Sequence, residues 1–232
     1  MSVNKTEKAM VSCRLIVAAT LILLAPCLGQ QVTLKFSYGL GKLIHDVLSN
    51  GHVSGSLVYS GTCKPRSPQN ASVPSVHAPR DLGSPPEVLQ GMFANDPKMR
   101  VTQDRDGIVR MTETDVPIDI LDVRIHHISF DDSKDDSGPW GLSFRGPNMA
   151  LPIILAAPEV EAFKKAHNIE PGFFFRAPGN ALDSGLPIIS GELNDVTVSQ
   201  ALDYILKASP GFWVYENCSF EDGSRSAHFW FY

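Results

Sequence analysis

An internal duplication constrains the fold of this chain more than any other feature, because residues 74–103 align without a gap with residues 187–216. Few aligned positions are identical, but they share structural roles: strand end, helix cap, buried helix face, helix stop and returning strand. The pairs with matching roles are Pro74 and Pro187, Ser84 and Thr197, Glu87 and Gln200, Leu89 and Leu202, Pro97 and Pro210, and Val101 and Val214. The repeat predicts one small unit built twice.

Each copy contains a helix whose start is marked by a capping box. In the first copy the box is Ser84 with Glu87, and in the second it is Thr197 with Gln200. In such a box the two side chains bond reciprocally to backbone amides that the helix leaves without a partner. The second helix also has apolar residues at helical spacing, namely Val198, Ala201, Leu202, Ile205 and Leu206.

The duplication extends upstream of the aligned segments. Helices are predicted over 40–48 and 158–167, and the strand at 57–59 corresponds to 173–175. The predicted fold class is therefore α+β, with two tandem small units of order α-β-β-α-β-β whose helices pack on a small sheet. The predicted boundaries are 1–29 for a signal peptide, 30–113 for the first unit, 114–154 for a linker with a further strand and an acidic turn, and 155–232 for the second unit.

The N-terminal residues have the pattern of an export signal. Lys5, Lys8 and Arg14 precede an apolar run, Leu15–Ala25, which is too short for a bilayer span of about 20 residues. Cleavage is predicted near Gln30, which places the mature chain outside the cytoplasm, in a periplasm or in the medium. Anchoring of the uncleaved signal or lipidation of Cys27 is the alternative.

The charge balance argues against nucleic acid as a partner. The chain carries a net charge of −5 and has no basic cluster, whereas binding to phosphates requires concentrated Lys and Arg. No segment after the signal is long and apolar enough to predict a membrane span.

Two cysteines, Cys63 and Cys218, remain after the signal is removed. In an oxidising compartment their pairing is favoured, and the bond would join the two units. Closing a loop of about 150 residues stabilises a fold by about 5 kcal/mol in the chain-entropy account. The alternative is two separate thiols.

The duplicated segments resemble the short N-terminal (STN) domain shared by secretins and TonB-dependent transducers. The resemblance rests on Val32–Tyr38 leading into Leu43–Leu48, on Gly191–Leu206, and on Pro210–Tyr215. It covers most of both predicted units. The resemblance implies an extracytoplasmic module that binds a membrane-bound regulator or an assembly partner, without catalysis. In that family the domain normally precedes a channel, a barrel or a plug, and this sequence has none after the second unit.

Ionisable residues in the predicted linker give only a weak indication of chemistry. His126 and His127 precede four aspartates, Asp131, Asp132, Asp135 and Asp136. Adjacent histidines on a strand point to opposite faces, and Asp136 stands where a calcium loop needs glycine, so no metal site and no cofactor are predicted. No nucleophile elbow, zinc-protease helix, phosphate loop or Cys-x-x-Cys motif occurs. An envelope hydrolase using these residues in a cleft between the units is an alternative function.

The second copy differs from the first by an aromatic hairpin. If Phe212, Val214, Phe229 and Phe231 face the helices, a second aromatic face remains, and its residues are the predicted partner-binding set: Trp213, Tyr215, His228, Trp230 and Tyr232. Trp and Tyr are frequent in binding hot spots. The alternatives are packing of this face against the first unit or the linker, and a glycan or small-ligand site at Trp213 and Trp230. The sequence thus predicts an exported, non-enzymatic protein-interaction module with an envelope protein as partner.

Overall fold

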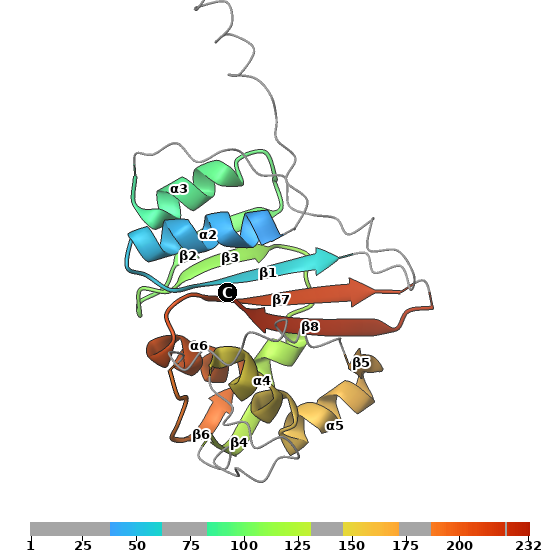
Figure 1. Ribbon diagram of the computed structural model, residues 1–232. Coiled ribbons are helices and arrows are strands. Elements are labelled where there is room, and N and C mark those ends of the chain that lie inside the picture. The colour runs from blue at the N-terminus through green and yellow to red at the C-terminus, as the bar shows by residue number, and fades with distance from the viewer. Residues whose placement is uncertain (1–37, 62–82, 131–145, 172–186, 221) are drawn as a thin grey trace, which may run out of the picture. The chain divides into compact units, whose positions relative to one another are not determined.

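A mixed sheet of six strands runs through the computed structural model (Figure 1). Its strands are β1 (Gly55–Gly61), β2 (Met99–Gln103), β3 (Val109–Glu113), β5 (Ile169–Pro171), β7 (Phe212–Ser219) and β8 (Arg225–Phe231), and a separate sheet of two strands consists of β4 (Arg124–Ser129) and β6 (Glu192–Thr197). The order in the large sheet is β2-β3-β1-β7-β8-β5. The structure describes residues 38–61, 83–130, 146–171, 187–220 and 222–232, all within one unit, Leu34–Tyr232.

The strands of the large sheet fall into two groups of three with the same internal pairing. In the N-terminal half (residues 38–113), β2 and β3 form an antiparallel hairpin and β1 runs parallel to β3. In the C-terminal half (residues 124–232), β7 and β8 form the hairpin and β5 runs parallel to β8. The two halves meet where β1 and β7 pair in parallel over seven residues, from Gly55 with Phe212 to Gly61 with Cys218.

Helices cover both faces of the large sheet (Figure 1). They are α2 (Tyr38–Asn50), α3 (Pro85–Met92), the 3-10 turn η3 (Asp119–Asp122), α4 (Pro147–Leu155), α5 (Pro158–Ala166) and α6 (Val198–Ala208). Helices α2 and α3 pack on one face, and α4, α5 and α6 lie on the opposite side. Helix α4 contacts β8 of the large sheet and β4 of the small one, so it lies between the two sheets. The α+β class is thus confirmed.

The core between the sheet and α2/α3, called the N-terminal core, is completed by the C-terminal half. Its buried members are Leu40, Ile44, Leu48, Leu57, Tyr59, Leu89, Met92, Phe93, Met99, Val109, Met111, Phe212 and Val214. Phe212 and Val214 belong to β7, and both are fully buried. The helices of the first half therefore pack on strands from both halves.

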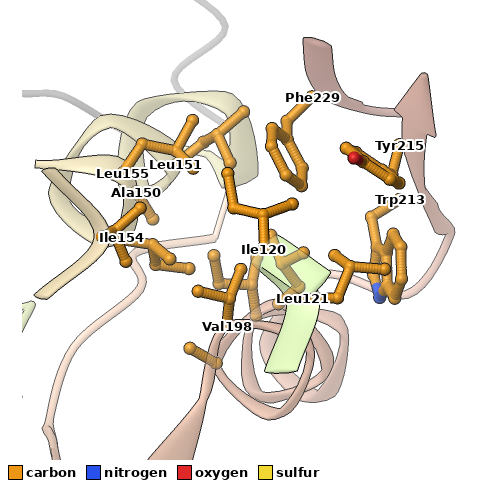
Figure 2. Packing of buried hydrophobic residues seen from close by; sticks show 14 of the residues in the cluster. Ile120, Leu121, Ala150, Leu151, Ile154, Leu155, Val198, Trp213, Tyr215 and Phe229 are labelled. Carbon is orange, nitrogen blue, oxygen red and sulfur yellow. The ribbon is translucent and has the colours of Figure 1, made fainter. Parts of the chain in front are cut away.

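The core on the opposite face, called the C-terminal core, includes η3, α4, α6 and the aromatic residues of the β7–β8 hairpin. Figure 2 shows Trp213, Tyr215 and Phe229 pointing from the hairpin toward Ile120 and Leu121. Helix α4 adds Ala150, Leu151, Ile154 and Leu155 to this cluster. Val58 of β1 also belongs to it, so β1 contributes to both cores.

The helix starts follow from the capping boxes that the sequence contains. The backbone N–H of Ser84 donates to Glu87 Oε2 at 2.8 Å at the start of α3. At the start of α6, the N–H of Thr197 donates to Gln200 Oε1 at 2.8 Å, and the N–H of Gln200 donates to Thr197 Oγ1 at 3.2 Å. Both predicted boxes are confirmed. Helix α4 was not predicted; it contains Pro152 and is the least amphipathic of the α-helices in the described ranges.

Candidate functional site

Two of the predicted partner-binding residues, Trp213 and Tyr215, are core residues. They are 2% and 0% exposed. The indole N–H of Trp213 donates to Asp203 Oδ1 at 2.9 Å, and the Tyr215 hydroxyl donates to the Pro117 carbonyl at 3.0 Å. Their polar atoms are thus satisfied by α6 and by the segment before η3, as a buried Trp and Tyr require.

The other three residues of that set, His228, Trp230 and Tyr232, are half-buried and lie on the opposite face of the sheet. Trp230 is directly opposite Val214, and Tyr215 is directly opposite Phe229. Residues opposite each other in an antiparallel pair share a face. The expectation that Val214 and Phe229 share a helix-facing side is therefore wrong. The five predicted residues do not form one surface.

Tyr232 packs closely against the N-terminal half. Its ring stacks on Phe212, with the ring centroids 5.0 Å apart and the planes 7° from parallel. A Cβ atom at Gly41 would collide with the Tyr232 ring. The absence of a side chain at residue 41 therefore lets α2 come close to the end of β8. This aromatic residue contributes to the joining of the halves.

The predicted histidine pair lies on β4 with both side chains exposed. His126 Nδ1 is 3.1 Å from Asp195 Oδ1, and His127 Nδ1 is 2.9 Å from Asn194 Oδ1. Asp195, on the neighbouring strand, has a φ of +51°, and the ladder between β4 and β6 omits the pair that would join it to His126. The four aspartates that follow lie outside the described residues, and within the described ranges no three His, Cys, Asp or Glu side chains form a metal-binding cluster.

Cys218 is fully buried near the end of β7. Its Cα partner is Gly61, the last residue of β1, across the parallel pairing of β1 with β7 that we call the joint. Cys63 lies outside the described residues, so the Cys63–Cys218 bond stays a prediction.

A half-buried carboxyl group, that of Glu216, lies where β1 and β7 pair. Glu216 on β7 is directly opposite Tyr59 on β1, and the Tyr59 hydroxyl hydrogen-bonds to its carboxylate. Burial raises the pKa of Glu216, and the bond from Tyr59 opposes this only in part. Burial and the nearby Glu216 charge also raise the pKa of Tyr59. A side chain at Gly61 would collide with the Glu216 carboxylate.

Arg110 on β3 connects the first hairpin to α6. Arg110 donates to Asp203 at 2.8 Å through Nη1 and at 2.6 Å through Nη2. It also donates to Asp104 Oδ2 at 3.0 and 2.7 Å. Burial would raise the pKa of Asp104, but bonds from Arg110 and backbone amides outweigh it and lower that pKa. With Trp213 also bonded to Asp203, these four residues form what we call the Arg110 network.

A cleft of about 610 Å³ opens beside the Arg110 network. Its walls come from the loop His52–Ser54 and the turn Asp106–Ile108 in the first half, and from β6 and α6 in the second. Leu193, Val196 and Leu206 supply apolar surface, while Lys207 supplies a cation. The volume falls within the range of small-ligand sites. His126 and His127 do not line this cleft.

The outer edge of β2 forms one end of the large sheet. The N–H of Thr114 donates to Lys98 and that of Asp104 donates to Ile108, both at 3.0 Å. Because hydrogen-bonded pairs alternate along an antiparallel ladder, the N–H and C=O of Val101 and Gln103 point away from β3. Among the described strands, β2 has no neighbour on that side.

The proposed function rests on the geometry of the cleft, the Arg110 network and the β2 edge. A comparison of the chain with protein-family models, with curated proteins and with solved structures yields no match. Within the part of the chain that the structure describes, no helix has both the length and the apolar character of a membrane span.

Proposed function

We propose that this chain is an exported, non-enzymatic protein-interaction module that binds an envelope partner by strand addition to the outer edge of β2. The observation that carries the proposal is that the backbone N–H and C=O groups of Val101 and Gln103 face away from β3. Among the described strands, none pairs with β2 on that side. An added strand gains main-chain hydrogen bonds from such an edge, and nearby side chains give specificity. The aromatic residues are less suitable as a docking surface because Trp213 and Tyr215 are buried.

The proposal includes two tandem units that resemble the STN domain. It is supported by the repeated pairing, in which an antiparallel hairpin and one parallel strand occur in each half. It is also supported by the order of elements, because α5, β5, β6, α6, β7 and β8 occur in the order α-β-β-α-β-β. The strand predicted at 173–175 lies outside the described residues, and β5 precedes it. Strand β4 pairs with β6, which joins part of the predicted linker to the second unit.

The proposed location outside the cytoplasm rests on the signal sequence, which lies outside the described residues. A disulfide bond between Cys63 and Cys218 would fit this location, because disulfides form in oxidising compartments outside the cytoplasm. Cys63 is two residues beyond Gly61, whose Cα pairs with Cys218, and two residues of extended chain span at most about 7 Å. The chain therefore allows the two sulfur atoms to meet.

Replacement of Val101 tests the binding edge. Val101→Pro removes an N–H that faces away from β3 and leaves the bonds between β2 and β3 intact. Val101→Ala is the matched control, because it shortens the same side chain and keeps the donor. Each variant is cross-linked in native cell envelopes, and the captured proteins are identified by mass spectrometry. We expect Val101→Ala to retain a partner that Val101→Pro loses, and equal capture by both variants would refute the edge.

A second candidate function, small-ligand binding, is favoured by the cleft beside α6. Its volume and its mixed lining suit a ligand with an apolar body and an anionic group that reaches Lys207. NMR screening with carboxylate-bearing fragments would show shifts at Leu193, Val196 and Leu206 if the cleft binds. Lys207→Gln should weaken those shifts, and Lys165→Gln on α5 should not. Absence of shifts at these positions excludes the cleft.

A further inference from the structure

The joint between β1 and β7 has a pattern that recurs at the two ends of the large sheet. Strand β1 is the parallel strand of its half, and β7 is the outer strand of the hairpin in the other half. The joint thus pairs a parallel strand with an outer hairpin strand. The two end strands are of the same two kinds, because β5 is the parallel strand of its half and β2 is the outer hairpin strand of its half.

The strand directions make the two ends compatible. Strands β3 and β7 run in the direction of β1, whereas β2, β8 and β5 run in the opposite direction. Strands β2 and β5 therefore run the same way. A second copy displaced along the sheet without rotation would bring its β2 beside β5 in parallel, which is the pairing found at the joint.

The helices allow the same displacement. In the N-terminal half they cover one face of the sheet, and in the C-terminal half they cover the other. The covered face alternates from one half to the next. A displaced copy continues this alternation, since its first half again has its helices on the face opposite those of the preceding second half.

We infer that two copies of this chain associate head to tail, with the outer edge of β5 in one copy pairing in parallel with the outer edge of β2 in the next. This inference rests on the proposed function because both use the β2 edge. The contact is heterologous, so it leaves one edge of each kind open and can extend beyond a dimer.

The available backbone groups indicate a weak contact. On β5, the Asn168 carbonyl accepts from the N–H of Arg225 at 3.4 Å, which directs the N–H and C=O of Ile169 outward. Pro171 offers no N–H, and short edge strands with proline limit edge pairing. The β1–β7 joint uses seven residue pairs, whereas β5 spans three residues. Association should therefore need high protein concentration.

Sedimentation velocity over a concentration series tests the inference with the full chain. We expect the mass of the wild-type protein to rise with concentration past that of a dimer, and Val101→Pro to remain monomeric. Val101→Ala should behave as wild type. Equal melting temperatures for all three proteins would show that the substitutions leave the fold intact.

A mixing experiment separates this contact from a symmetric one. Val101→Pro blocks β2 but leaves β5 able to bind, so labelled Val101→Pro should co-sediment with unlabelled wild-type complexes and reduce their mean mass. Pairing of β2 with β2 would leave the labelled variant monomeric, and this result would overturn the head-to-tail contact. A wild-type chain that is monomeric at every concentration would also overturn it. In that case, loss of partner capture by Val101→Pro would still support the proposed function.

Discussion

The two halves of this protein pair their strands in the same way but cover opposite faces of the sheet. In the N-terminal half, α2 and α3 pack on a face that Phe212 and Val214 of the other half complete. In the C-terminal half, α6 lies on the opposite face and reaches back to Arg110 through Asp203. As a result, the core of each half includes residues of the other half.

The predicted disulfide would be the strongest connection between the halves. If Cys63 and Cys218 are bonded, Cys63→Ser, Cys218→Ser and the double variant should lose the same stability, about 5 kcal/mol in the chain-entropy account. Urea unfolding of the oxidised proteins measures the loss. Additive losses in the double variant, or two thiols titrated in the denatured wild-type chain, would refute the bond.

Removal of the Phe212 ring should damage the half to which the residue does not belong. Phe212→Ala leaves a cavity in the N-terminal core and should cost about 3–5 kcal/mol. Hydrogen exchange should accelerate in α2 and α3. Phe231→Ala is the matched control on the opposite face, and it should accelerate exchange in α4 and α6 instead. The same exchange pattern in both variants would contradict separate cores.

Loss of the Arg110–Asp203 ion pair should loosen the attachment of α6 to the first hairpin. Asp203→Asn leaves Arg110 partly buried with one carboxylate partner fewer and should cost about 1–3 kcal/mol. Lys42→Ala, which removes an exposed pair with Asp46 on α2, should cost less, because solvent screens an exposed ion pair. Thermal unfolding of both variants measures the difference. Equal costs would show that the network does not stabilise the joint.

The carboxyl group of Glu216 should make the joint sensitive to pH. Because its pKa is raised in the folded state, the folded protein holds the proton more tightly, and stability should fall as the pH rises from the ordinary value of Glu through the raised one. Each unit of difference is worth about 1.4 kcal/mol. Glu216→Gln should unfold at higher temperature than wild type at neutral pH, and this gain should vanish near pH 4. A gain that is independent of pH would contradict this account.

The elements that the sequence predicts well are those determined by local interactions. Helix α6 was predicted from its capping box and its apolar stripe, because both depend on residues within one or two turns. The side of the sheet to which each residue of β7 and β8 points was not predicted correctly. Positions 212–215 of β7 are all buried, since helices from different halves cover its two faces, and strict alternation of apolar and polar residues disappears in a strand buried on both sides.

The candidate sites depend on contacts that no local pattern contains. Arg110 and its partner Asp203 lie 93 residues apart in the sequence. The cleft combines two loops of one half with a helix of the other, so only the fold defines it. The existence of an edge strand can be predicted, because a small open sheet must have two end strands. Only the order of the six strands shows that β2 is one of them.

The parallel pairing of β1 with β7 also bears on how the chain reaches its folded state. Strand β1 lies near the start of the described chain, yet β7, one of its two neighbours in the sheet, begins only at Phe212. Contacts so distant along the chain slow folding, because the loop between them must close before they can form. We expect the assembly of the N-terminal core to wait for the C-terminal hairpin, with the inner edge of β1 exposed until then. A chaperone that binds extended apolar strands would find its target in residues 55–61.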